Sequence, residues 1–354
     1  MSSQRQDSPP GISLKRRVLS VPTLISFSVA AAFVFLLAAR FDVDWTDTWD
    51  NVRAINPWLY AVAIISYYLS FVFRGLRWRI LAQNAASGEA PGPDLPSWPR
   101  FAQLIVIGWF VNAIAWLRLG DAYRSYALAA DSRKSFPWSL GTILAERVMD
   151  MAIIFALMVV GAIFLSSSSD SSASIYILVA ASAMALALVA FVAVMKLSGE
   201  RVIRFLPGRL QVIYVRFRQG TLGSFRRMPL LITLGLMGWA MEMARVYFVV
   251  EALGLDIGLA LVLDVAMGHA ILSVVPTPGG VGVVEPGLTG LLLLGLGRVD
   301  AVLVTVVDRS ITYLSVVAVG FVAFLAGQVW QARRNRRLSS STTLAVEQEA
   351  GREA

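Results

Sequence analysis

The amino-acid sequence predicts an all-α, polytopic membrane protein with about six full spans, two re-entrant broken-helix segments and an inverted repeat. Two features of the composition indicate this class. Hydrophobic residues make up 57% of the 354 residues and charged residues only 15%, whereas soluble domains are about 25% charged. The charged residues also leave several uncharged stretches of the roughly 20 residues that a helix needs to cross a bilayer. A soluble globular enzyme is therefore excluded.

The chain contains no cysteine and a single histidine, His269. Without cysteine, the protein has no disulfide, no thiolate nucleophile and no sulfur ligand for a metal. One histidine cannot form a multi-histidine metal centre, so we expect no metal and no other cofactor. The net charge of +8 is interpreted as basic cytoplasmic loops beside anionic lipid, and not as a nucleic-acid surface.

Six segments are expected to cross the membrane as helices. Five of them carry no charge, and the sixth is long enough but contains Glu242, Arg245 and Glu251. The predicted spans are residues 18–39, 54–73, 151–169, 171–195, 229–253 and 310–332. The first is too long for a cleaved signal peptide and lacks a small-residue cleavage site, so we expect it to remain as a span.

Two further apolar segments, 101–117 and 257–297, are interrupted by polar residues, glycine or proline. The loop charges decide how these segments lie. If both are re-entrant, every basic stretch falls on the cytoplasmic side and the acidic loop 40–53 falls outside. A full crossing by 101–117 would instead place the basic loop 196–227 outside. The re-entrant arrangement is therefore predicted, in the cell membrane, with both termini cytoplasmic.

The membrane domain is predicted to cover residues 16–332, between two polar ends. Residues 1–15 are expected to be a disordered tail, and residues 333–354 a cytoplasmic tail. Residues 200–218 alternate arginine with phenylalanine, leucine, isoleucine and tyrosine. This pattern is typical of an amphipathic stretch on the inner leaflet, although a solvated loop with a few anchors fits nearly as well.

Two parts of the chain, about 54–169 and 229–332, align with each other at an offset of 162 residues. In each part an acid–arginine pair follows a glycine, with the arginine 27 residues after it. The matched glycines are Gly120 and Gly282, and the matched arginines are Arg147 and Arg309. One extra span between the two parts would invert the second, and inverted repeats place a substrate site near the middle of the membrane. Chance similarity between apolar helices is the alternative.

Ionisable residues inside spans cost about 2.5–3.5 kcal/mol each, so they should be paired or face a hydrated cavity. Glu146, Arg147 and Asp150 share one face at the start of a predicted helix. Asp308 and Arg309 repeat the acid–arginine theme. Any single acid–arginine pair is explained by a structural ion pair that holds two helices together. The presence of charges on four segments favours one shared polar cavity.

The two interruptions supply the other candidate residues. Arg118 and Asp121 flank a glycine in the first, and the glycine-rich turn of the second has backbone N–H groups that could face an anion. A plain helix break is the alternative. The predicted substrate-binding residues are Asn112, Arg118, Asp121, Arg124, Glu146, Arg147, Asp150, Pro278, Gly279, Gly280, Gly282, Glu285, Asp308 and Arg309.

Other polar residues are interpreted as structural. Arg74, Arg77 and Arg79, with Trp78, are expected to anchor the inner end of the second span at the membrane interface, with contact to lipid phosphate as a second interpretation. His269 is expected to be a packed histidine, with a proton relay as the less favoured alternative.

Four motifs in order resemble the transmembrane region of the lysylphosphatidylglycerol synthase family, also called flippase-like. They are FRGLRW at 73–78, N-x5-R-x-G-D-x2-R at 112–124, E-R-x2-D at 146–150 and P-x-P-G-G-x-G-x2-E at 276–285. The resemblance covers residues 15–332 and implies a protein that moves a lipid between leaflets. In the best-known members this region flips aminoacylated phosphatidylglycerol made by a C-terminal synthase domain, which we expect to be missing here.

The resemblance and the buried charges together favour a flippase or transporter for an anionic or aminoacylated phospholipid, or for a related lipid-linked molecule. The chain is not expected to be an enzyme. The expected partners are a membrane phospholipid, a separate lipid-modifying enzyme and a second copy of the chain. Two alternatives remain: an embedded enzyme acting on lipid head groups through Glu285, Asp121 or His269, and an accessory subunit of a lipid- or glycolipid-modifying system.

Overall fold

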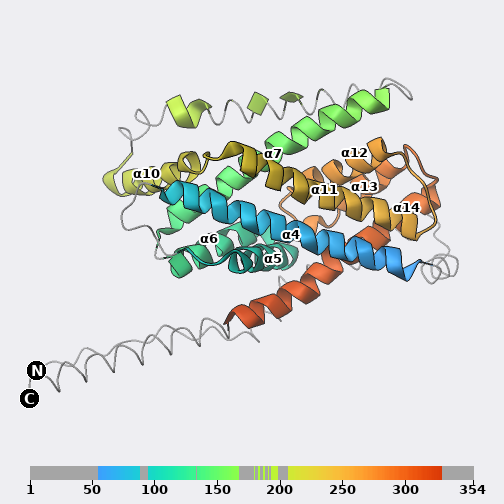
Figure 1. Cartoon of the computed structure of the whole chain (residues 1–354), viewed down its shortest axis with the longest axis horizontal. Helices are drawn as coiled ribbons and strands as arrows, with labels where there is room; N and C mark the ends of the chain where they lie inside the picture. Colours follow the sequence, from blue (N-terminus) through green and yellow to red (C-terminus); the bar gives the residue numbers. More distant parts are fainter. Residues whose placement is uncertain are drawn as a thin grey trace, which may run out of the picture.

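The computed structural model describes residues 55–87, 95–132, 134–166 and 206–328, with scattered helical residues between 179 and 197. Every regular element in these ranges is helical, as predicted (Figure 1). The elements are α4 (Pro57–Ala86), α5 (Trp98–Ile114), η1 (Trp116–Arg118), α6 (Leu119–Ser132), α7 (Phe136–Ser166), α10 (Gly208–Gly223), α11 (Met228–Ala252), α12 (Leu259–Leu272), η2 (Pro278–Gly280), α13 (Val284–Leu292), α14 (Arg298–Arg309) and η3 (Ser310–Ser315). The predicted span 18–39, most of 171–195 and both predicted tails lie outside the described residues.

Two of the described helices are long and apolar enough to cross a membrane. They are Pro57–Ala86 and the continuous helix Arg298–Gln328, formed by α14, η3 and the residues that follow. They overlap the predicted spans 54–73 and 310–332. The predicted span 151–169 overlaps the second half of helix α7, and 229–253 matches helix α11 to within one residue at each end. The number of membrane crossings and the inverted repeat remain predictions.

Helix α7 corrects one expectation, because it begins at Phe136 and runs for 31 residues. Glu146, Arg147 and Asp150 therefore lie well inside this helix and not at its start. Glu146 and Asp150 are 1% and 2% exposed. Ion pairs to other helices allow the helix to continue through these charged residues.

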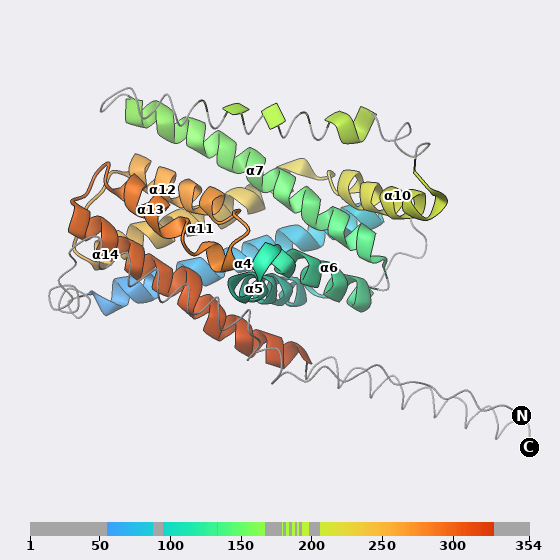
Figure 2. The ribbon, with the colours of Figure 1, turned by 180° about the vertical axis from the view of Figure 1, so that it is seen from behind.

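Helices α4 and α11 pack side by side, and α7 crosses behind them (Figures 1 and 2). Helix α10 packs closely against α7 at two glycines, Gly141 on α7 and Gly220 on α10. A methyl group on either glycine would overlap the main chain of the other helix. Helix α10 overlaps the predicted amphipathic stretch 200–218 and exposes Leu210, Val212 and Ile213. Its position at the inner leaflet remains a prediction.

The first interrupted segment forms a helical hairpin. Helix α5 ends at Ile114, and Leu117 and Arg118 then adopt left-handed backbone angles with φ of 62° and 51°. Helix α6 returns along α5. The backbone N–H of Gly120 donates to Asn112 Oδ1 at 2.8 Å, which ties the start of α6 to the end of α5. Asn112, a predicted ligand, thus has a structural role.

The Gly120→Ala variant is expected to lose about 1–3 kcal/mol of unfolding free energy, the usual cost of overpacking. The added methyl group would overlap the carbonyl oxygen of Gly108 and crowd Asn112 Oδ1. Thermal unfolding of the purified protein in detergent measures the loss. The matched control is Gly208→Ala, where a methyl group meets nothing within 4 Å. Equal stability of the two variants would contradict the close approach of α5 and α6.

The second interrupted segment forms another hairpin, in which α12 and α13 pack against each other across the turn containing η2. Gly279 and Gly280 have φ of 59° and 72°, a region that side chains disfavour. The two hairpins meet at their breaks. The backbone N–H of Leu117 donates to the Pro276 carbonyl oxygen at 3.4 Å, and α5 packs on η2.

Candidate functional site

A cavity of about 330 Å³ lies where the two breaks meet. Its wall combines ionisable side chains with the aromatic rings of Tyr67, Trp109 and Trp239. The lining arginines are Arg74, Arg118, Arg147 and Arg245, and the lining carboxylates are Asp121, Asp150 and Glu242. Five elements supply the charges that line this one cavity: α4, η1, α6, α7 and α11.

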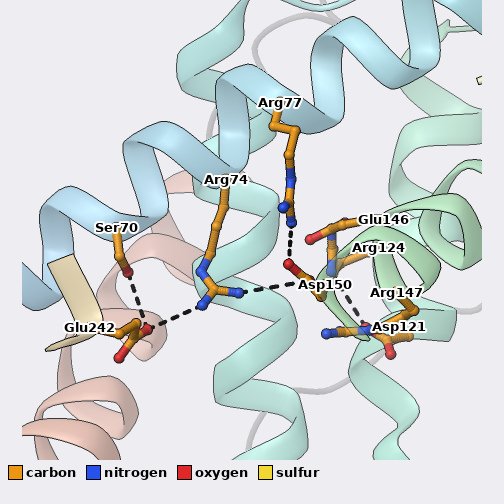
Figure 3. Close-up of polar contacts among 9 residues, drawn as sticks. All are labelled: Ser70, Arg74, Arg77, Asp121, Arg124, Glu146, Arg147, Asp150 and Glu242. Carbon is orange, nitrogen blue, oxygen red and sulfur yellow. Dashed lines mark hydrogen bonds and ion pairs between the residues drawn. The ribbon is translucent and has the colours of Figure 1, made fainter. Parts of the chain in front are cut away.

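One group of ion pairs joins α6 to α7 (Figure 3). Arg147 donates to Asp121 at 2.8 Å, and both side chains are about one-quarter exposed. Arg124 reaches Glu146 at 2.5 Å and Asp121 at 3.5 Å. Arg124 is 1% exposed and stacks over the ring of Trp78, 4.2 Å from its centroid. Arg124 and Glu146 thus support the wall from behind, whereas Asp121 and Arg147 face the cavity.

A second group comes from α4 and corrects the interpretation of Arg74 and Arg77 as interfacial anchors. Both are buried, with 5% and 1% exposure. Arg77 pairs with Asp150 at 2.6 Å, and Arg74 lies between Asp150 at 3.9 Å and Glu242 at 3.3 Å (Figure 3). The spacing of the two arginines, three residues apart on the face that also carries Ser70, is the sequence signal that could have identified them.

The network continues from α11 to α14. Arg245 contacts Glu242 at 3.3 Å and also pairs with Asp308. His269 Nδ1 lies 3.3 Å from Asp308 and 3.3 Å from Arg245. His269 is buried, as expected of a packed histidine. It also lines the cavity, which the sequence interpretation did not include.

The glycine-rich turn differs from its expected role. The N–H groups of Gly280, Val281 and Val283 donate to carbonyl oxygens of the turn itself. The N–H of Gly282 donates to Glu285 Oε2 at 2.8 Å. These four groups are therefore already bonded and do not form an open anion nest. The turn instead helps to position Arg309, whose Nη2 donates a 2.8 Å hydrogen bond to the Gly279 carbonyl oxygen.

Arg118 differs from the other three arginines that line the cavity. Among the described residues, no carboxylate oxygen lies within 4 Å of its guanidinium, which donates to the Ser273 carbonyl. Arg74, Arg147 and Arg245 each have a carboxylate partner. The left-handed backbone at Arg118, sparsely populated for residues other than glycine, holds it at the junction of the breaks.

The predicted site residues fall into three groups. Those on the cavity wall are Arg118, Asp121, Arg147 and Asp150. Those around a smaller adjoining chamber are Asn112, Gly279, Gly280 and Arg309. Those that support the walls are Arg124, Glu146, Pro278, Gly282, Glu285 and Asp308. In the part of the chain that the structure describes, no group of three or more histidine and acidic side chains could hold a metal ion.

The long apolar helices and their exposed apolar side chains define a helical membrane protein. Leu314 and Val322, on the helix Arg298–Gln328, are 60% and 65% exposed. Apolar surface of this extent is typical of helices in contact with lipid.

The chain belongs to the lysylphosphatidylglycerol synthase TM region family, whose model matches residues 23–320. A UPF0104 membrane protein of Methanocaldococcus jannaschii is 30% identical over 220 residues, 61% of this chain and 93% of that protein. A UPF0104 membrane protein of Methanothermobacter thermautotrophicus is 25% identical over 325 residues, 83% of this chain and 91% of that protein. The family resemblance found from the four motifs is thus confirmed.

Proposed function

We propose that this protein translocates a phospholipid between membrane leaflets by passing its polar head group through the 330 Å³ cavity. The observation that carries the proposal is the meeting of two helix breaks around one polar cavity within a largely apolar chain. Transfer of a lipid head group from water into hydrocarbon has a large unfavourable free energy, because polar groups lose their hydration there. A charged, hydrated cavity lowers that cost while the acyl chains stay in the bilayer.

The size of the cavity suits a head group and not a whole lipid. Ligand pockets measure about 300–1,000 Å³ for drug-sized molecules, so 330 Å³ accommodates a glycerol-phosphate or a similar group. The unpaired guanidinium of Arg118 favours an anionic lipid. The paired residues supply both signs of charge, which suits head groups that also carry an amine, such as aminoacylated phosphatidylglycerol.

The two hairpins support a proposed arrangement in the membrane. Hairpins α5–α6 and α12–α13 are re-entrant, enter from opposite faces and belong to inverted repeats about 54–169 and 229–332. The protein is a multi-pass protein of the cell membrane with cytoplasmic termini. In this arrangement a rocking motion of one repeat against the other would open the cavity to each leaflet in turn.

The Arg118→Gln variant tests this function. We expect it to slow translocation of fluorescent phosphatidylglycerol in proteoliposomes by on the order of 10- to 100-fold, since a hydrogen bond to a charged group contributes about 1.5–3 kcal/mol. Arg209→Gln is the matched control, because Arg209 is exposed on α10, away from the cavity. Equal translocation by the Arg118→Gln protein and wild type, or none above empty liposomes for wild type, would refute the proposal.

A further inference from the structure

A second, smaller chamber of about 50 Å³ adjoins the main cavity at the junction of the two breaks. The two spaces share part of their walls, which makes them two compartments of one site. The residues that line both are Trp109, Arg118, His269, Ser273 and Thr312.

The two compartments differ in charge. The main cavity is lined by three carboxylates as well as four arginines. The small chamber is lined by Arg118 and Arg309, and none of the described carboxylates lies on its wall. An anion in the small chamber therefore lies beside Arg118 and Arg309 with no carboxylate on the wall, and the one carboxylate paired with these arginines, Glu285, holds Arg309 from outside the chamber. In the main cavity an anion would face Asp121, Asp150 and Glu242 directly.

The donors of the small chamber are held in position. Arg309 is fixed by Glu285, at 2.9 Å from its Nε, and by the Gly279 carbonyl, at 2.8 Å from its Nη2. Its Nη1 makes no hydrogen bond to a described residue and remains able to donate. Thr277 Oγ is buried, has no hydrogen-bond partner in the described chain, and belongs to a residue that lines the chamber.

The volume of the chamber matches a small oxyanion. A water molecule needs about 10–15 Å³ of such space, so 50 Å³ holds about four oxygen-sized groups. A phosphate has four oxygens. A glycerol or an amino-acid ester attached to it would exceed this space and extend past Arg118 into the main cavity.

We propose that the small chamber is an oxyanion subsite that binds the phosphate of the translocated lipid between Arg118 and Arg309, with a hydrogen bond from Thr277. The remainder of the head group then lies in the main cavity. This assignment rests on the proposed function for the identity of the ligand as a lipid. The subsite itself is a property of the two breaks and can be tested without transport.

The test measures binding to the full chain in a maltoside detergent, which contains no phosphate. The probes are inorganic phosphate, dihexanoyl phosphatidylglycerol and, as the phosphate-free analogue, dihexanoyl glycerol, each titrated by calorimetry. We expect wild type to bind both phosphate compounds in competition, and the phosphate-free analogue far more weakly. Arg309→Gln should weaken phosphate binding by on the order of 10- to 100-fold, and Thr277→Val by about 3- to 10-fold. Arg209→Gln should bind as wild type does.

Thr277→Val nearly preserves volume and removes no charge, so it keeps the test valid if Arg309→Gln fails to fold. Absence of phosphate binding by wild type, or binding unchanged in Thr277→Val and in folded Arg309→Gln, overturns the subsite. Binding of inorganic phosphate without competition from the lipid overturns the lipid assignment.

Translocation measured in parallel separates this proposal from the previous one. If wild type translocates lipid and the Arg309→Gln protein does so at the same rate, the subsite is wrong and the proposed function stands. If phosphate binding is lost in the variants as expected but wild type moves no lipid, the subsite stands and the proposed function is wrong.

Discussion

Replacing Arg124 with glutamine is expected to destabilise the protein by about 3–5 kcal/mol, the cost of leaving one member of a buried ion pair without its partner. Glu146 is 1% exposed, and Arg124 is the ion-pair partner that the structure gives it, at 2.5 Å. The substitution also removes the guanidinium that stacks on Trp78. Thermal or denaturant unfolding in detergent, with Arg209→Gln as the control, measures the change.

The double variant Arg124→Gln/Glu146→Gln distinguishes ion pairing from packing. It removes both charges and leaves two neutral amide side chains at these positions. We expect it to recover most of the lost stability, because the uncompensated buried carboxylate is gone. If the double variant is as unstable as the single one, the stabilisation comes from the contact with Trp78 and not from the charge pair.

Joining the two breaks covalently is expected to stop translocation almost completely. Leu117 and Pro276 are in main-chain contact, at 3.4 Å between N and O. The chain has no native cysteine, so oxidation of the Leu117→Cys/Pro276→Cys variant can join only these two positions within one chain. If alternating access requires the hairpins to move apart, the oxidised protein cannot complete a cycle and reduction restores transport.

The two single variants, treated with the same oxidant, control for damage by the reagent. Full transport by the cross-linked protein would contradict movement of one hairpin against the other, and would favour passage of the head group along a fixed groove.

The sequence predicted an all-helical chain and placed four predicted spans, 54–73, 151–169, 229–253 and 310–332, on long helices, because uncharged stretches near 20 residues are typical of helices buried in hydrocarbon. It predicted helix ends poorly. Helix α7 begins at Phe136 and the last described helix at Arg298, each more than ten residues before the predicted span. Charged residues near these starts were taken as boundaries, whereas the helices continue through them because partners on other helices neutralise the charges.

Only part of the candidate site could be predicted, because the local sequence does not show which partners on other helices a charged side chain will meet. Charges placed near glycines indicated a shared cavity, and Arg118, Asp121, Arg147 and Asp150 line it. The partners on α4 were missed, since Arg74 at the end of an apolar stretch has the same local pattern as an interfacial anchor. Only the packing of α4 against α11 turns that side chain inward, toward Glu242 at 3.3 Å.

The turn around Gly282 shows what a motif leaves open. Glycines allow positive φ, and the turn uses that freedom at Gly279 and Gly280. Whether the backbone N–H groups then face a ligand depends on which acceptors the turn supplies to itself. Here the Glu285 side chain and three carbonyl groups accept them, so the turn positions Arg309 and does not bind an anion through its own amides.

Thiol accessibility can show whether the two breaks enclose a water-filled cavity within the membrane. Ser273 lines both compartments, whereas Val319, 42% exposed, lies on the apolar surface assigned to lipid. Ser273→Cys and Val319→Cys proteins in lipid nanodiscs are treated with a negatively charged methanethiosulfonate reagent, which reaches both faces and reacts in water. We expect rapid modification of the Ser273→Cys protein and little modification of the Val319→Cys protein. An unreactive thiol at position 273 in the folded protein would contradict a water-filled cavity.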